Sequence, residues 1–231
     1  MLLLALAIAP GLAICLIIYS RGKYGKEPLR YLLVSFLLGM LSTVLPLLVQ
    51  FFSSDIRGDY NHHGILATAW FAFVVVGVSE ETSKFLMLRL YAYPKAVFRG
   101  PFDGIVYAVM IGMGFATLEN IEYVERFGMS TGISRFFLSV PAHASFAVLM
   151  GYNVGLAKLR PSSAAWLMWK GLLVAVFFHG SFDFFVFLQQ NERVKQYVSE
   201  GLLSFGAFAT FYIAIRLAMR TIRMQKTYDT D

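Results

Sequence analysis

Seven long apolar stretches follow one another along the chain, separated by short polar links. A helix rises about 1.5 Å per residue, so about 20 apolar residues cross a hydrocarbon core about 30 Å thick. The seven stretches are Leu2–Tyr19, Tyr31–Phe52, Ile65–Leu90, Asp103–Tyr123, Phe136–Leu156, Trp166–Leu188 and Leu202–Met219. The pattern predicts an all-α fold, a polytopic membrane helix bundle with about seven transmembrane helices.

The links between these stretches contain turn-forming residues, as in Arg21-Gly22-Lys23 and Arg160-Pro161-Ser162-Ser163. None of them is long or low enough in complexity to separate two domains, and the chain shows no internal repeat. We therefore expect a single integral membrane domain over residues 1–231, with a core over about 65–188. No basic residue precedes the first stretch, so we expect a retained helix rather than a cleaved signal peptide.

The composition agrees with a membrane protein. Of the 231 residues, 58% are hydrophobic and only 15% are charged, whereas soluble proteins carry about 25% charged residues. This excludes an ordinary soluble enzyme. The single cysteine, Cys15, excludes an intramolecular disulfide and a cysteine-based metal cluster.

Basic residues gather at alternate links. Fourteen of the 20 Lys and Arg residues fall on one side of the predicted bundle, five fall on the other, and Lys84 lies inside the third stretch. The larger group comprises Arg21, Lys23, Lys26, Arg30, Arg89, Lys95, Arg99, Lys158, Arg160, Lys170, Arg216, Arg220, Arg223 and Lys226; the smaller comprises Arg57, Arg126, Arg135, Arg193 and Lys195. Because cytoplasmic loops carry the excess of positive charge, we expect the N-terminus outside and the C-terminus in the cytoplasm. The net charge of +6 then reflects contact with the inner leaflet rather than nucleic-acid binding.

Ionisable residues also occur deep inside the third to sixth stretches. A charged side chain at the centre of a membrane helix costs about 2.5–3.5 kcal/mol on insertion scales, so these groups must face one another or a water-filled cavity. Counting along each helix places them between the midplane and the outer leaflet. They are Glu80, Glu81, Lys84, Glu119, His143, His179 and Asp183. We therefore expect one buried polar site, supported by the first, second and seventh helices, which lack deeply buried charge.

Local spacing suggests how two pairs are arranged. Glu80 and Lys84 are four residues apart on one helix face, whereas Glu81 is turned away by about 100°. His179 and Asp183 have the same spacing, so the carboxylate can orient the imidazole. Phe115 lies one turn before Glu119, where its bulk also suits simple packing.

Carboxylates and histidines in a desolvated site suit hydrolysis by activated water. One carboxylate can remove a proton from water, and a histidine can stabilise the developing oxyanion. Two histidines and a carboxylate can also hold Zn²⁺, although the sequence has no H-E-x-x-H motif. Two other functions fit the same residues: an ion- or proton-coupled transporter and a non-catalytic membrane scaffold.

Four motifs in order on consecutive helices resemble one known family. They are Glu80-Glu81-Thr82-Ser83-Lys84 (E-E-x-x-K), Phe115-Ala116-Thr117-Leu118-Glu119-Asn120 (F-x-x-x-E-N), the histidine His143, and His179-Gly180-Ser181-Phe182-Asp183 (H-x-x-x-D). Lys26-Glu27-Pro28 and Asp103-Gly104-Ile105-Val106-Tyr107 add further matches. The chain thus resembles the PrsW family of bacterial intramembrane proteases, which is related to the type II CAAX prenyl endopeptidases. Glu119 and Lys84 stand where those relatives usually have His and Arg, so a prenylated substrate is not expected.

The resemblance implies a multi-pass protease of the bacterial cell membrane. Its partner would be a single-pass anti-sigma factor, cut first near the extracytoplasmic face, which leads to sigma factor release. The implied catalytic residues are Glu80, Glu81, Glu119, His143, His179 and Asp183, supported by Lys84, Phe115 and Asn120. The sequence favours a glutamate-activated water without a cofactor. If zinc is present, the expected ligands come from Glu80, Glu81, Glu119, His143 and His179.

Overall fold

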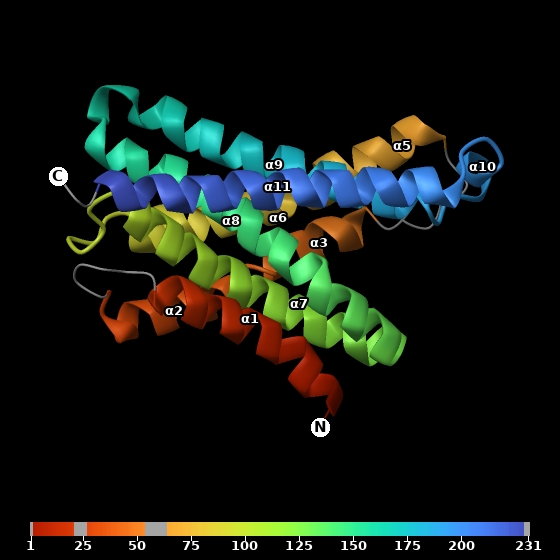
Figure 1. Ribbon diagram of the computed structural model, residues 1–231, viewed down its shortest axis with the longest axis horizontal. Helices are drawn as coiled ribbons and strands as arrows, with labels where there is room; N and C mark the ends of the chain where they lie inside the picture. Colours follow the sequence, from red (N-terminus) through yellow and green to blue (C-terminus); the bar gives the residue numbers. More distant parts are fainter. Residues whose placement is uncertain (1, 21–26, 54–63, 229–231) are drawn as a thin grey trace.

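The computed structural model describes residues 2–20, 27–53 and 64–228, with side chains up to residue 224. Arg21, Lys23, Lys26 and Arg57, used above to predict the orientation, lie outside the described residues, as does the side chain of Lys226. The described chain is all-helical, as predicted (Figure 1). Its helices are α1 (Leu2–Ser20), α2 (Leu29–Leu41), α3 (Val44–Phe52), α5 (Ile65–Trp70), η1 (Phe71–Val78), α6 (Ser79–Met87), η2 (Leu88–Ala92), α7 (Pro101–Phe137), α8 (Ser139–Leu159), η3 (Pro161–Ser163), α9 (Ala164–Leu188), α10 (Glu192–Lys195) and α11 (Glu200–Tyr228).

Within the described ranges, six helical segments are long and apolar enough to cross a membrane. The fourth, Pro101–Leu159, has 59 residues, which at about 1.5 Å per residue is far longer than one crossing needs. It consists of α7 and α8, which pack antiparallel: a Cβ atom at Gly104 would collide with Gly151, and one at Gly112 would lie only 3.0 Å from the Ala147 Cβ. This segment therefore accounts for two of the seven predicted crossings.

Small residues allow these helices to approach closely. A Cβ at Gly39 of α2 would collide with the Ile111 carbonyl of α7, and one at Gly114 of α7 with the Phe36 carbonyl of α2. Backbone contact of this kind is typical of helix pairs in membranes. The hydrophobic effect does not drive helices together in lipid, so small residues allow tight van der Waals packing instead. As a result α7 lies at the centre of the bundle, with α1 and α2 on one side and α8 on the other (Figure 1).

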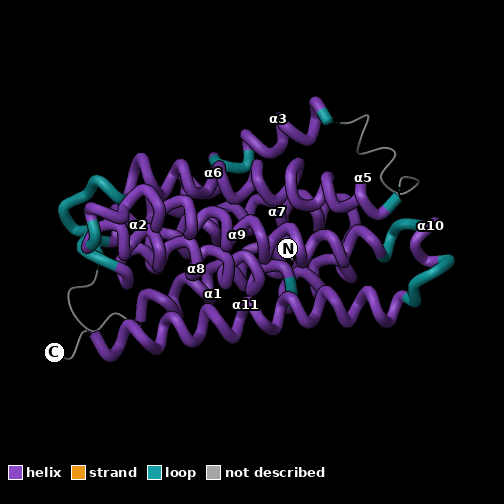
Figure 2. Tube along the Cα trace, turned by 90° about the horizontal axis from the view of Figure 1, so that it is seen from above, coloured by secondary structure: helices purple, strands orange, loops and turns teal. Residues whose placement is uncertain are grey.

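The second predicted crossing, Tyr31–Phe52, is not one continuous helix. It is broken at Ser42 and Thr43 into α2 and α3. Pro46 explains the break, because it has no N–H for a helical hydrogen bond and its ring clashes with the carbonyl four residues earlier. Figure 2 shows α3 at the margin of the bundle, where it packs against α6 and η1.

The third crossing is continuous but changes its winding. Two π-helical segments, η1 and η2, flank the α-helix α6. The hydroxyl of Ser79 donates to the Val75 carbonyl where η1 passes into α6. Local π-winding rotates the residues that follow it, and it is frequent at functional sites. Here it directly precedes Glu80 and Glu81.

Candidate active site

Helix α6 brings two carboxylates and one ammonium group into the interior of the bundle. The Lys84 Nζ lies 2.8 Å from Glu81 Oε1 and 3.3 Å from Glu80 Oε2, and all three side chains are buried. The predicted Glu80–Lys84 pair is therefore present, but Lys84 bridges both glutamates and is closer to Glu81. Of the two glutamates, Glu80 is the one that lines the cavity described below.

Helix α9 places His179 between three carboxylates. Its Nδ1 is 2.7 Å from Glu81 Oε1, and its Nε2 is 3.2 Å from Asp183 Oδ2 and 3.8 Å from Glu80 Oε2. Glu81 can accept a hydrogen bond from Nδ1–H, which directs Nε2 towards Glu80 and Asp183. The predicted i, i+4 pair of His179 and Asp183 is present in the structure.

Helix α8 contributes His143, whose ring stands nearly perpendicular to that of His179 at a centroid distance of 5.0 Å. Its Nε2 is 3.0 Å from Glu119 Oε2, and its Nδ1 is 3.4 Å from Lys84 Nζ. Phe115 fills the space beside it, with its ring 5.9 Å from the His143 ring and 3.9 Å from Lys84 Nζ. Phe115 thus packs on the charged cluster itself, not on distant apolar residues alone.

Glu119 and Asn120 of α7 contact Arg135, which the sequence analysis used only to predict the orientation of the chain in the membrane. The Arg135 guanidinium lies 2.6 Å from Glu119 Oε2 through one nitrogen and 2.6 Å from Asn120 Oδ1 through another. No motif marks Arg135, and the fourth predicted crossing ends at Tyr123, whereas α7 continues to Phe137. Only the backward turn of the chain brings Arg135 to the cluster.

A cavity of about 870 Å³ opens onto these groups. Glu80, Glu119, His143, His179 and Asp183 line it, while Glu81 and Lys84 lie outside it. Gln50 of α3 and Ser204 of α11 also line it. The second and seventh crossings were expected only to support the site. They also form part of the cavity wall, because α3 packs beside η1 and α11 beside α9, whose residues line the same cavity.

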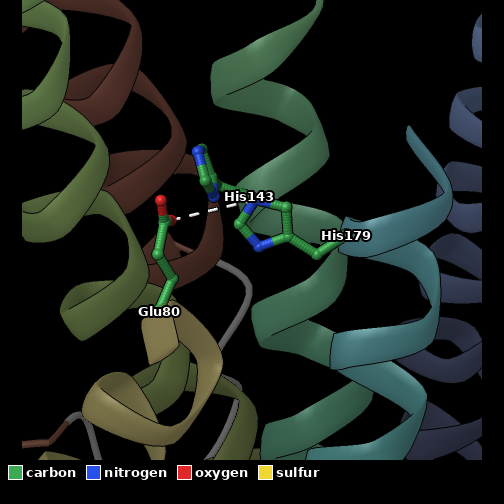
Figure 3. Close-up of side chains that lie close together, drawn as sticks. All are labelled: Glu80, His143 and His179. Atoms are coloured by element: carbon green, nitrogen blue, oxygen red, sulfur yellow. Dashed lines mark ion pairs between the residues drawn. The ribbon is translucent and has the colours of Figure 1, made fainter. Parts of the chain in front are cut away.

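Three donor groups are arranged as a metal site requires. One ligand atom each from Glu80, His143 and His179 lies within 4.8 Å of the others, and all three residues are buried (Figure 3). The Glu81 carboxylate on His179 Nδ1 is the partner that commonly orients a metal-binding histidine. Glu81 and Glu119, which the sequence also offered as ligands, contact the histidines from outside this group of three.

The charges in contact here also suit a divalent cation. Four carboxylates meet two permanent cations, so two negative charges remain uncompensated if the histidines are neutral; the groups are Glu80, Glu81, Glu119 and Asp183, against Lys84 and Arg135. Such an excess is costly in a buried site unless a cation or protons balance it. The residues present therefore fit a Zn²⁺ ion held by two histidines and a carboxylate.

Fold and site together define a multi-pass membrane protein with a buried cluster of carboxylates and histidines, the arrangement expected of an intramembrane peptidase. Residues 27–217 match the sequence model of the PrsW family, described as intramembrane metalloproteases. The chain belongs to this family.

Several curated relatives carry the name Protease PrsW. The chain is 33% identical to the one from Geobacillus kaustophilus over 82% of its own length and 81% of the relative's. It is 33% identical to the one from Bacillus subtilis over 82% of its own length and 84% of the relative's, and 31% identical to the one from Clostridioides difficile over 81% and 80%. No solved structure matches the chain significantly.

Proposed function

We propose that this peptidase makes the first cut in a single-pass membrane anti-sigma factor, near the extracytoplasmic face, and so leads to sigma factor release. The observation that carries the proposal is the cavity of about 870 Å³, which brings carboxylates and histidines from four helices to one place. The family resemblance supplies the substrate class. A cavity of this size accommodates an unwound peptide segment, whereas ion pairs that close on one another would leave no room for a substrate.

We further propose that Glu80, His143 and His179 hold a zinc ion. Although the sequence favours a metal-free mechanism, the donor trio and the family's description as metalloproteases support the zinc alternative. Bound zinc would supply Lewis-acid chemistry that polarises the scissile carbonyl and makes water easier to deprotonate.

Asp183 is the residue proposed to move protons. Its carboxylate lines the cavity 3.2 Å from His179 Nε2, the nitrogen that would face zinc, and within the described chain no lysine or arginine forms an ion pair with it. It would accept the proton of the attacking water and return it to the amine nitrogen as the peptide C–N bond breaks. Glu119 differs, because Arg135 holds it as a fixed charged group.

The substrate must leave helical hydrogen bonding before water can reach its backbone. That step is costly in hydrocarbon, where freed N–H and C=O groups find no partner. The cavity has polar residues beyond the catalytic cluster, among them Ser134 and Gln190. With the N-terminus outside, as proposed from the basic residues, this polar end would open to the extracytoplasmic side.

Thiol labelling tests this orientation. In a Cys15→Ala background, Ser134→Cys would place a thiol at the cavity and Ser162→Cys would place one at the opposite end of the bundle; both residues are exposed. An impermeant reagent added outside intact cells should label the first thiol and not the second. Labelling of the second alone would reverse the orientation.

Cleavage of a reporter tests the function. Purified protein in nanodiscs is mixed with candidate single-pass anti-sigma factors from the same bacterium, tagged at both ends, and the products are mapped by mass spectrometry. We expect a cut near the extracytoplasmic end of the substrate helix, absent with Asp183→Asn. Substrate-dependent ion flux in proteoliposomes without any cleavage would favour a transporter instead.

A further inference from the structure

The end of α7 folds back over the site. Residues 119 and 135 are 16 positions apart, a separation of about 24 Å along an uninterrupted helix, yet their side chains touch. The chain reverses at Gly128, whose φ of 78° and ψ of −161° are accessible essentially to glycine alone. The segment after Gly128 packs back on the segment before it, because Gly132 faces the Val124 side chain.

This reversal delivers Arg135 into a fixed position. Its guanidinium contacts Glu119 and Asn120, each at 2.6 Å, and lies 4.1 Å from the centre of the Tyr123 ring. The side chain is only 13% exposed. Asn120 is in turn tied to α1, since its amide donates to the Ala7 carbonyl at 3.4 Å. A planar guanidinium with several donors is well suited to hold a carboxylate in one orientation.

The same oxygen of Glu119 connects Arg135 to the site. Glu119 Oε2 accepts from Arg135 and lies 3.0 Å from His143 Nε2. Arg135 also lines the cavity, but the contacts of its side chain are with Glu119, Asn120 and the Tyr123 ring. We therefore expect Arg135 to act on the reaction through Glu119 and the orientation of the His143 ring, whereas a direct contact with the substrate would raise KM alone.

We propose that Arg135, carried back over the site by the chain reversal at Gly128, is a positioning residue that holds Glu119 against His143. The proposal deepens the proteolytic and metal-binding roles proposed above and rests on them. Partner groups of metal-binding histidines commonly change metal affinity by about 10–100-fold when they are removed. A displacement of about 1 Å in a catalytic group can cost about 10²-fold in rate.

The test is a double-mutant cycle with two readouts. Arg135→Met, Glu119→Gln and the double variant are compared in kcat and KM for reporter cleavage, and in Co²⁺ affinity measured from the visible spectrum. We expect Arg135→Met to lower kcat by about 10²-fold with little change in KM, and to weaken Co²⁺ binding by about 10-fold or more. In the Glu119→Gln background the Arg135 substitution should add little, because its route of action is already lost.

Arg193→Met serves as a control, since Arg193 is an exposed arginine of α10 that does not line the cavity. Arg135→Lys keeps the positive charge but lacks the planar guanidinium, so it should restore part of kcat and part of the Co²⁺ affinity. It replaces Arg135→Met in the test if that variant does not accumulate. Unchanged kcat and Co²⁺ affinity, a rise in KM alone, or fully additive effects would overturn the proposal. If the wild-type protein cleaves no reporter, the substrate proposal fails, and the Co²⁺ cycle still decides the role of Arg135.

Discussion

Two clusters of charge in this protein contain buried carboxylates but have very different surroundings. One is the cluster of carboxylates and histidines from the four central helices, which we propose to be catalytic. The other lies at the opposite end of α7, where Glu27 accepts from the Tyr107 hydroxyl at 2.7 Å and Arg99 bridges Glu27 and Asp103. Only the first contains histidines and lines the main cavity. Buried charge alone therefore does not identify a catalytic site. The distinguishing features are histidines, an excess of negative charge and an opening into the cavity.

The second cluster can balance itself without a metal. Arg99 and the Tyr107 hydroxyl satisfy most of its acceptors. Burial raises the pKa of Glu27 to about 7, compared with about 4.3 for a free glutamate. A single proton then removes the remaining negative charge. We interpret this cluster as a structural tie between the start of α2 and the start of α7.

The largest contrast should come from removing one acidic group in each cluster. Glu80→Gln takes a charged donor from the proposed zinc site, so we expect reporter cleavage to fall by more than about 10³-fold and zinc to be lost. Glu27→Gln should leave the rate per folded molecule within about twofold of wild type. Rates and zinc content of both purified variants check this. Equal losses in the two variants would remove the distinction between the clusters.

Within the catalytic cluster, Glu81 should behave differently from Glu80. Glu81→Gln keeps the trio of donors but weakens the carboxylate that orients His179, so we expect zinc affinity and cleavage to fall by about 10–100-fold. Titration with a zinc chelator at matched protein concentration measures this. A complete loss of zinc, as in Glu80→Gln, would show that Glu81 is itself a ligand.

The sequence predicts the helices and most of the site because both follow from local rules. Long apolar runs identify each crossing, and i, i+4 spacing identifies the pairs Glu80–Lys84 and His179–Asp183. The remaining features depend on long-range geometry. Nothing in the spacing shows that Lys84 bridges both glutamates, that Arg135 folds back onto Glu119, or that α3 and α11 line the cavity. The break before Pro46 had a local signal, which the continuous hydrophobicity of the stretch concealed.

The second cluster predicts a pH dependence of stability. The folded protein binds the Glu27 proton more tightly than the unfolded chain does, so this group favours folding below about pH 4.3, and the benefit is lost as pH rises through about 7. At about 1.36 kcal/mol per pKa unit, the upper bound is about 3.7 kcal/mol. Thermal unfolding in nanodiscs between pH 5 and 8 should show a falling midpoint in wild type and a flatter profile in Glu27→Gln. A midpoint that rises with pH in wild type and not in the variant would contradict this.

The smallest expected effect concerns Asp103. It lies in the first turn of α7 and accepts from the backbone N–H of Arg99 at 2.7 Å. Asp103→Ala should destabilise the protein by about 1–2 kcal/mol, because a favourable charge near the helix N-terminus and a hydrogen bond are lost. Chemical unfolding followed by circular dichroism measures this loss. A large change in the rate per folded molecule would show that the second cluster takes part in catalysis.

Metal dependence tests the central claim most directly. Purified protein is analysed for zinc, its cleavage of a single-pass reporter is measured, and both measurements are repeated after chelation and after zinc is added back. The account predicts about one zinc per chain, loss of cleavage with the metal, and recovery on its return; His179→Ala should neither bind zinc stoichiometrically nor recover. Full cleavage by protein shown to contain no metal would contradict the zinc site and restore the glutamate-activated water that the sequence alone favours.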